Sequence, residues 1–512
     1  MPTLVATHST AEPRADTAPA PLPRQPDRLR DFLNSEAARL AGTIALYSFP
    51  ALLFIRAFYI VDPDIWWHLR AGQWVLQNHA VPATDPFSSH GAGQPWVLYS
   101  WLFDAFMASA LDRLGLVTIA CYEIAVRIAL SVALFCVLRT LAPGFWRAAA
   151  LTAAAIFAMT RVLGPRPGMM TILLVTVVLG VLLSITRTGR TRLLWLLPPL
   201  FVLWANWHIQ FVYGLFVLGV FAAEPWINSL CRYRPRAESQ LPPAAAWLTL
   251  AACSLATLLN PYGIKVYSTV FLYAGQTRVY NQISEFLAMS FREPQHYLAL
   301  LLAIGAAMAI GWRRDPRPLW LILLSVTSVL AFRSVREIWF LAIVSVCIIA
   351  DGWKSPGNTV LNAARFSPRS RALVGVWVLA LAIASCRHYG LSNDALEIQV
   401  AGTFPEASVR YVEMHHLEGP LLNDLSWGGY LIWRLPNLPV ALDGRTNVHD
   451  EDRILRFSSI WKGKPGWESD PDLARANLVL TPRDAAIASL LRASPQFQIA
   501  YEDSQAVVFR RR

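Results

Sequence analysis

Long apolar runs alternate with short polar or basic intervals over most of the chain, and this pattern predicts membrane-spanning helices. The first run covers about residues 41–61 and the second 116–138, and nine more follow. Several are shorter than the roughly 20 residues that a bilayer requires, so the pattern predicts about eleven spans but not their ends. The nine later runs are 148–163, 169–186, 193–206, 211–229, 242–259, 297–312, 318–332, 338–351 and 372–386.

A polar segment, residues 62–115, separates the first two runs and is predicted to form the first exported loop. Two helices are expected in it, at 64–79 and at 96–114. In the second, the apolar residues leave one face to Ser100, Asp104 and Asp112, which is typical of a helix that lies at the membrane interface.

Beyond about His388 the pattern changes to short strand-like runs alternating with helix-like ones, which predicts a small α/β domain. The segments are ASVRYVEMHHL, DRILRFSSIW and AAIASLLRA as helices, ANLVL, FQIAYED and QAVVFRR as strands, and GPLLND, WGGYLIWRL and PVALDGR between them. The predicted organisation is therefore a disordered tail (1–40), a mainly α transmembrane domain (41–387) and an exported α/β domain (388–512).

Composition agrees with a multi-pass membrane protein, since 55% of the 512 residues are hydrophobic and only 15% are charged. The net charge of +11 sits in short clusters between apolar runs, as in cytoplasmic loops, which argues against nucleic acid as a partner. Alternation of the spans keeps the clusters and the N-terminus inside and exports the C-terminal domain. The clusters are Arg187/Arg190/Arg192, Arg232/Arg234/Arg236, Arg313/Arg314/Arg317 and Lys354/Arg365/Arg369/Arg371.

The stretch from Tyr59 to Phe87 carries the most distinctive polar residues. Asp62 and Asp64 flank a proline, and His68 follows Asp64 by four residues, so a helix opened by Asp64 would present both side chains on one face. A capped helix at the membrane interface and an active-site loop explain these residues equally well.

Other ionisable residues are predicted on the same outer side, opposite the basic loops. Individually each has a structural explanation, such as an arginine that reaches lipid headgroups, but ionisable groups near a bilayer are costly and together they suggest a site. A carboxylate there is suited to act as a general base, and arginines are suited to a phosphate leaving group. These residues are Arg161, Arg166, His208, Glu285, Arg333 and Arg336.

The segment DPDIWWHLRAGQWVLQNHAVPATDPFS, followed by GQPW and SWL, resembles the first exported loop of the GT-C superfamily of membrane glycosyltransferases. LWANWH, NPYG, ISEF, RSVRE and GGYLIWRL…ALDGR resemble one bacterial branch of it, related to the dolichyl-phosphate-mannose and aminoarabinose transferases. The resemblance runs from about Ala41 to the C-terminus. It implies a polyprenyl-phosphate-linked sugar donor, a lipid, polysaccharide or protein acceptor, and catalysis by Asp64, with Asp62 second.

The resemblance also bears on cofactors. Some GT-C enzymes use a divalent metal and others do not; Asp62, Asp64, His68 and Asp85 are the candidate ligands by residue type. Relatives often have a glutamate after the Pro-Trp pair, where this chain has Ser100. If that glutamate contributes to catalysis or metal binding, the resemblance implies that this member is altered in mechanism or inactive.

The favoured hypothesis is therefore a glycosyltransferase acting at the outer face of a bacterial cytoplasmic membrane, in contact with membrane lipid. One alternative is a transporter or flippase of a lipid-linked substrate, although no internal repeat is evident. The other is a non-catalytic assembly protein, in which Asp443, Gly444 and Arg445 form a surface motif or, equally, a turn after a buried strand.

Overall fold

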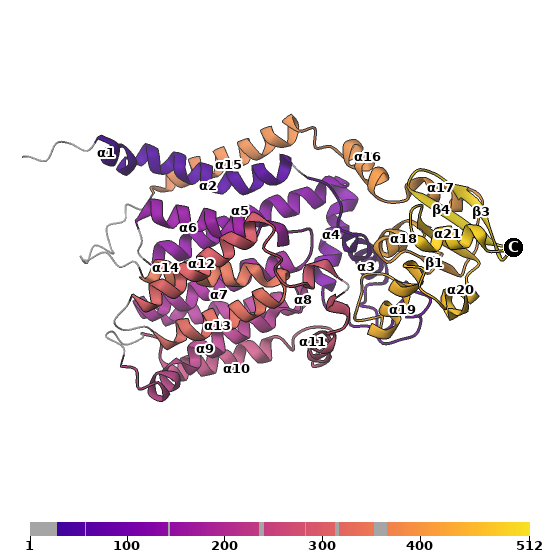
Figure 1. Ribbon diagram of the computed structural model, residues 1–512. Coiled ribbons are helices and arrows are strands. Elements are labelled where there is room, and N and C mark those ends of the chain that lie inside the picture. The colour runs from indigo at the N-terminus through magenta and orange to yellow at the C-terminus, as the bar shows by residue number, and fades with distance from the viewer. Residues whose placement is uncertain are drawn as a thin grey trace, which may run out of the picture.

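The computed structural model describes residues 28–56, 58–141, 144–234, 240–281, 283–312, 317–352 and 366–512. It consists of a long bundle of helices with a small α/β domain at one end (Figure 1). The predicted class, a mainly α membrane protein with a C-terminal α/β domain, is confirmed.

Each apolar run predicted from the sequence coincides with a helix. Within the described residues, six of these helices (α2, α5, α7, α9, α12 and α15) are long and apolar enough to cross a membrane. The total of eleven spans remains a prediction, because the other helices are shorter. The bundle contains α2 (Glu36–Arg56), α5 (Val117–Thr140), α6 (Phe145–Ala158), α7 (Gly168–Thr188), α8 (Leu197–Trp207), α9 (Phe211–Leu230), α10 (Pro243–Ala256), α12 (Pro294–Gly311), α13 (Pro318–Arg333), α14 (Ile338–Gly352) and α15 (Pro368–His388).

The predicted ends of the first span need correction. Helix α2 begins at Glu36 and a further helix, α1 (Arg28–Asn34), precedes it, so residues 28–34 and 36–40 of the predicted disordered tail are helical. Residues 1–27 of that tail lie outside the described residues. The helix also stops at Arg56 rather than near Val61, and residues 58–62 before α3 lie in neither a helix nor a strand.

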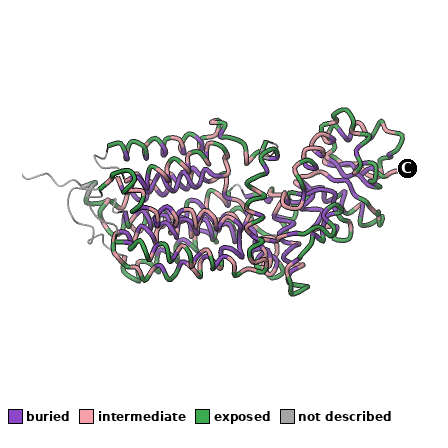
Figure 2. The backbone as a smooth tube through the Cα atoms, turned by 90° about the horizontal axis from the view of Figure 1, so that it is seen from below, coloured by how far each residue is buried: buried purple, intermediate pink, exposed green. Residues whose placement is uncertain are grey.

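Burial within the bundle is that expected of helices surrounded by lipid. Helix α14 packs among its neighbours and is buried along almost its whole length. The outer helices instead have many exposed residues, drawn in green in Figure 2. Large apolar side chains are among them, such as Leu248 and Leu255 of α10 and Leu379 of α15. An apolar surface of this kind is stable only against other apolar matter, which in this case is the bilayer core.

Two helices form in the predicted first loop, α3 (Asp64–Asn78) and α4 (Trp101–Leu114). The second starts later than predicted, since residues 96–98 are extended. The two helices pack closely because Gly72 lies against the backbone of Asp104, where a Cβ would come within 2.0 Å of its carbonyl oxygen. The remaining elements between the bundle helices are α11 (Lys265–Gly275) and the 3-10 turns η1 (Thr160–Val162), η2 (Thr191–Leu196), η3 (Val279–Asn281), η4 (Ser284–Phe286) and η5 (Val335–Glu337).

The α/β domain is built on a four-stranded mixed sheet in the order β1-β2-β4-β3. Strands β1 and β2 are parallel and the other pairs are antiparallel. Its elements are α16 (Asn393–Thr403), α17 (Glu406–Met414), β1 (Leu421–Asn423), η6 (Leu425–Trp427), α18 (Gly428–Arg434), α19 (Glu451–Trp461), η7 (Trp467–Ser469), α20 (Pro471–Arg475), β2 (Leu478–Pro482), α21 (Ala486–Ala493), β3 (Phe497–Glu502) and β4 (Ala506–Arg511).

The predicted strands and helices of this domain are confirmed, and the three segments left unassigned are now defined. GPLLND contains strand β1. The other two segments contact the first loop. WGGYLIWRL is mostly helix α18, which packs on α3, with Gly429 so close to the Pro63 carbonyl that a Cβ would lie 2.3 Å from it. PVALDGR forms no named strand; instead Val440 pairs with Ser88 of the first loop by an isolated bridge. Both segments therefore join the domain to the first loop.

Candidate active site

A cluster of three acidic and two basic side chains lies where the helical bundle meets the α/β domain. Arg166, just before α7, is at its centre: its Nε is 2.5 Å from Asp62, its Nη1 2.6 Å from Glu285 and its Nη2 3.3 Å from Asp64. Arg336 of η5 completes it, with Nη1 3.7 Å from Glu285. We call these five residues the acidic cluster. It unites segments from four parts of the chain.

Asp64 is the first residue of α3, as the sequence predicted, and its two carboxylate oxygens have different surroundings. Oδ1 accepts a hydrogen bond from the Trp67 indole at 3.3 Å, whereas Oδ2 faces Arg166. Burial raises the pKa of Asp64 to about 6, because the loss of hydration and the nearby Asp62 and Glu285 outweigh the pull of Arg166. The side chain still has 21% of its surface exposed, so it remains reachable.

Asp62 fixes the start of α3. Its Oδ1 accepts the backbone N–H of Asp64 at 2.9 Å, and its Oδ2 accepts from Arg166. Asp62, rather than Asp64, therefore caps the start of α3. The carboxylate of Asp64 is not used as the cap and remains available for other contacts.

The pKa of Glu285 is shifted in the opposite direction from that of Asp64. Although burial alone would raise its pKa, Arg336 and Arg166 outweigh that effect and lower the pKa of Glu285 below its ordinary value. Two neighbouring carboxyl groups therefore have pKa values displaced in opposite directions, an arrangement typical of sites that handle protons.

The α/β domain covers one side of the acidic cluster. Gly444 sits directly on Asp64: a Cβ at that position would lie 2.1 Å from Asp64 Oδ1. Next to it, Arg445 is completely buried between Asp443 and Asp85. The interpretation of Asp443, Gly444 and Arg445 as an exposed surface motif is therefore wrong for the two charged residues, whose side chains are buried in a turn, and only Gly444 between them is exposed.

Three of the predicted phosphate-binding residues lie outside the acidic cluster. Arg161 is exposed and pairs with Glu293 at 2.8 Å. His208 is buried and its Nδ1 is 2.9 Å from the Thr171 hydroxyl. Arg333 is exposed at the end of α13. Of the six residues predicted to bind the lipid phosphate, three lie in the acidic cluster with Asp62 and Asp64: Arg166, Glu285 and Arg336.

The candidate metal ligands are directed to different partners. Asp85 accepts from Arg445, and His68 Nδ1 lies 2.6 Å from Asp104, while Asp64 faces Arg166. Throughout the described part of the chain, no three His, Cys, Asp or Glu side chains are grouped so that they could hold a metal ion. These residues do not fit a shared metal site.

Ser100 belongs to a separate buried set. Its hydroxyl donates to Asp104 Oδ2 at 3.1 Å and lies 3.4 Å from His68 Nδ1. All three side chains are buried between α3 and α4, with Trp67 stacked on the His68 ring. The set joins the two helices, so the contacts of Ser100 are those of a structural residue.

We therefore expect Ser100→Ala to leave catalysis nearly intact. The variant loses one hydrogen bond to a buried carboxyl group, which costs about 1–3 kcal/mol of stability and lowers the melting temperature. The turnover rate at a temperature well below melting should stay within about threefold of wild type, because Ser100 touches no member of the acidic cluster. A much larger loss of turnover in a well-folded variant would contradict this assignment.

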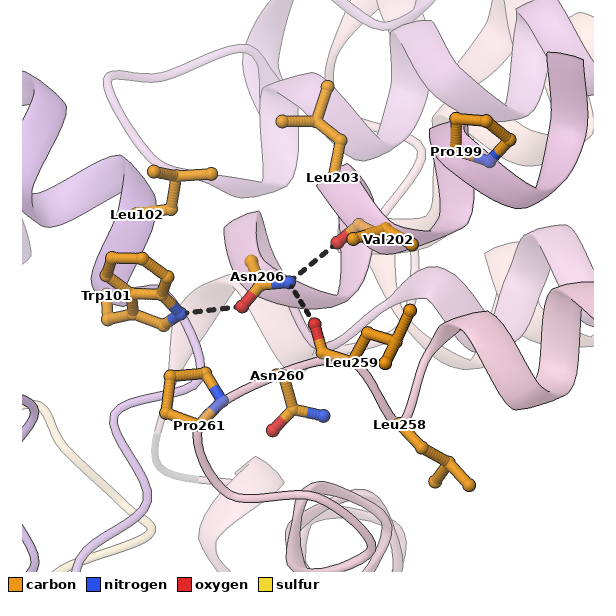
Figure 3. A pocket seen from close by; sticks show the side chains of 10 residues that line it. All are labelled: Trp101, Leu102, Pro199, Val202, Leu203, Asn206, Leu258, Leu259, Asn260 and Pro261. Carbon is orange, nitrogen blue, oxygen red and sulfur yellow. Dashed lines mark hydrogen bonds between the residues drawn. The ribbon is translucent and has the colours of Figure 1, made fainter.

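A groove of about 740 Å³ opens on the side of the bundle between α4, α8 and the end of α10 (Figure 3). Its walls are mainly apolar, with Trp101, Leu203 and Leu258 among them. Asn206, from the LWANWH motif, accepts from the Trp101 indole at 2.8 Å and donates to the Leu259 carbonyl at 2.9 Å. This motif thus ties α8 to α4 and to the NPYG turn, and the groove beside it is suited to an apolar chain.

Sequence reasoning missed the contact between Gly444 and Asp64 and the pairing of Arg445 with Asp85. The available signal was that ALDGR resembled the same family as the Asp64 segment. Nothing in the spacing indicated that the two segments, 380 residues apart, touch each other.

No family model and no curated protein matches the sequence. Among solved structures, the fold is similar to the oligosaccharyltransferase AglB of Archaeoglobus fulgidus in complex with an inhibitory peptide and a dolichol-phosphate, with a TM-score of 0.52, 10% identity, and coverage of 86% of this chain and 69% of that one. The apo oligosaccharyltransferase of the same organism gives a TM-score of 0.51, 10% identity and coverage of 88% and 70%. ArnT of Cupriavidus metallidurans bound to undecaprenyl phosphate superposes less well, with a TM-score of 0.48 at 14% identity over 93% of this chain and 98% of that one. The chain therefore shares its fold with the archaeal oligosaccharyltransferase.

Proposed function

We propose that this protein transfers a sugar from a polyprenyl-phosphate carrier to a lipid, polysaccharide or protein acceptor, at the outer face of the cytoplasmic membrane. The observation that carries the proposal is the carboxyl group of Asp64 at the junction of bundle and α/β domain: it lies 3.3 Å from Arg166, Arg336 joins the same cluster through Glu285, and the pKa of Asp64 is raised to about 6. The oligosaccharyltransferase fold, which in its solved relative binds a dolichol-phosphate, supports the same class of donor.

The chemistry assigns a role to each part of the acidic cluster. Asp64 accepts the proton that the acceptor hydroxyl or amine loses as it forms a bond to the anomeric carbon. The bond from that carbon to the phosphate oxygen breaks, and the lipid phosphate leaves with its electron pair and negative charge. Arg166 and Arg336 stabilise this charge, and Asp62 and Glu285 hold the arginines in position.

The distribution of charge over the bundle supports the proposed side of the membrane. The described basic residues predicted in cytoplasmic loops lie at helix ends far from the α/β domain, for example Arg187 at the end of α7 and Arg317 before α13 (Figure 1). The positive-inside rule then orients the acidic cluster and the α/β domain outward.

The direct test uses the purified protein in lipid vesicles with a panel of polyprenyl-phosphate-linked sugars. Release of the free lipid phosphate reports transfer or, without an acceptor, slow hydrolysis. A deletion strain should accumulate the lipid-linked sugar and lack it on a surface glycan, and complementation with the wild-type gene should reverse both changes. An unchanged profile of lipid-linked sugars and surface glycans, together with no release from any donor, would refute a role in sugar transfer.

The pH dependence of transfer should report the ionisation of Asp64. A base acts only when deprotonated, so the rate should be constant above pH 7 and fall about tenfold per pH unit below the pKa near 6. An ordinary carboxyl group would keep the rate constant down to about pH 4. Rates measured between pH 4 and 8 at saturating donor would distinguish the two curves.

A further inference from the structure

The turn that follows PVAL in the α/β domain, Asp443–His449, contacts both chain segments that supply carboxyl groups to the acidic cluster. We call it the DGR turn. It touches the first loop through Gly444 and Arg445, and it touches the segment between α11 and η4 through Thr446. The first loop carries Asp62 and Asp64, whereas the other segment leads to Glu285.

The contact with the first loop is a buried network of charges centred on Arg445. Its guanidinium donates to Asp443 at 2.7 Å and to Asp85 at 2.6 Å, and His449 Nε2 lies 3.0 Å from Asp443. All four side chains are completely buried. Arg445 also lies over the rings of Phe87 and Trp96, at 5.3 and 4.8 Å from their centroids. The fork of one arginine thus fixes the turn to the first loop in a defined orientation.

Further hydrogen bonds extend the turn to its other neighbours. Asn447 donates to the carbonyl of Val97 at 3.2 Å, and Gln276 donates to the carbonyl of Thr446 at 2.5 Å. Glu451, two residues past the turn, accepts the backbone N–H groups of Arg278 and Val279 at 2.9 and 3.1 Å. The segment that leads to Glu285 is therefore held by the same part of the α/β domain that holds Asp64.

From these contacts we infer that the DGR turn is a positioning element of the active site: Arg445 clamps it to the first loop so that Gly444 presses on Asp64 and sets the distance between Asp64 and the Arg166–Glu285 pair. The inference rests on the proposed function for its catalytic readout. Neither residue supplies a chemical group to the reaction, since Gly444 has no side chain and Arg445 is enclosed. Their effect is transmitted through Asp64.

The first test is Gly444→Ala, with Gly402→Ala as the matched control. The backbone of Gly444 has an ordinary negative φ, so alanine introduces no strain there, but its methyl group would overlap Asp64 Oδ1. Gly402 lies in α16 of the same domain, and a Cβ there meets nothing within 4 Å. We expect at least a tenfold lower turnover number for Gly444→Ala with little change in the KM for donor, and wild-type values for Gly402→Ala.

A second readout follows the pKa of Asp64 and is measured in two ways, from the rate of transfer and from chemical labelling. Separation of the turn from Asp64 admits water, so the acid limb of the pH–rate profile should move from near pH 6 towards the ordinary carboxyl range near 4. Asp64 can also be labelled with a water-soluble carbodiimide and glycinamide, and the extent of labelling measured by mass spectrometry as a function of pH. The midpoint of that curve should move to lower pH as well. The labelling needs no donor and no activity.

If Gly444→Ala does not fold, Arg445→Lys serves instead. Lysine keeps the buried charge but cannot bridge Asp85 and Asp443 with a planar fork, so the same loss of turnover and the same shift of the labelling midpoint are expected. Wild-type turnover and an unshifted midpoint in either folded variant would overturn the inference, and so would an equal loss in Gly402→Ala. If wild-type protein transfers no sugar while the midpoint still shifts, the proposed function fails but the positioning role stands.

Discussion

Replacement of Asp64 by asparagine is expected to lower the rate of sugar transfer by at least about a hundredfold, because general-base catalysis typically contributes 10²–10⁴. Asparagine has almost the same shape, so its oxygen can still accept from the Trp67 indole and fit beneath Gly444. It cannot take up a proton. Binding of the donor should change little, since Arg166 keeps its stronger contacts with Asp62 and Glu285. Turnover and donor KM, measured in the vesicle assay, would separate the two effects.

The matched control for this variant is Asp112→Asn. Asp112 lies on α4 in the same first loop and is exposed, so the same chemical change removes a carboxylate that takes no part in the acidic cluster. It should retain wild-type transfer. Full activity of Asp64→Asn, with normal membrane insertion and melting temperature, would remove Asp64 as the base. Asp62 would then have to be tested in its place.

The helices of the bundle could be predicted because a bilayer imposes a simple rule. Backbone polar groups in lipid must pair within their own segment, so apolar runs become helices almost regardless of detail. The ends were harder: the apolar run through Tyr59 and Val61 continues past Arg56, yet the helix stops there. Those residues instead extend towards Asp64, where the first loop packs against the α/β domain.

For the residues of the acidic cluster, the sequence predicted only that they lie on the same side of the membrane. Charge alternation placed the residues of both arginine pairs on one face, but it could not tell which member of each pair points inward. Arg166 reaches Asp62, whereas Arg161, only five residues earlier, turns away to Glu293. That choice depends on the turn between α6 and α7, which side-chain packing determines and periodicity does not.

The role of the DGR turn depends on tertiary contacts alone. ALDGR reads equally well as a surface loop or a buried turn, since the sequence does not reveal that Asp85 neutralises Arg445. Buried charges are recognisable only together with their partners. Local pattern therefore predicted the helices, the strands and the candidate residues, while the pairing between distant segments required the structure.

Replacement of Arg166 is expected to have the second large effect, and in a distinctive direction. Arg166→Ala removes the one side chain that contacts all three carboxylates, leaving Asp62, Asp64 and Glu285 close together with Arg336 alone. Turnover should fall by about a hundredfold or more, a magnitude typical of the loss of a group that stabilises transition-state charge. Arg166→Lys should recover little, because one ammonium group cannot reach three partners with a planar fork.

The pH dependence distinguishes loss of the arginine from general damage to the fold. Arg166 lowers the pKa of Asp64, so without it the pKa must rise above about 6, and transfer should be lost already at neutral pH and partly return under alkaline conditions. Arg161→Ala is the control, since Arg161 pairs only with an exposed glutamate and should behave as wild type. An acid limb that stays near pH 6 in Arg166→Ala would show that this arginine does not act on Asp64. Gly444→Ala should move the acid limb of the pH–rate profile in the opposite direction, to lower pH. Misfolding common to both variants cannot shift the limb in two opposite directions. Opposite shifts are explained by the titration of Asp64, which contacts both Arg166 and Gly444.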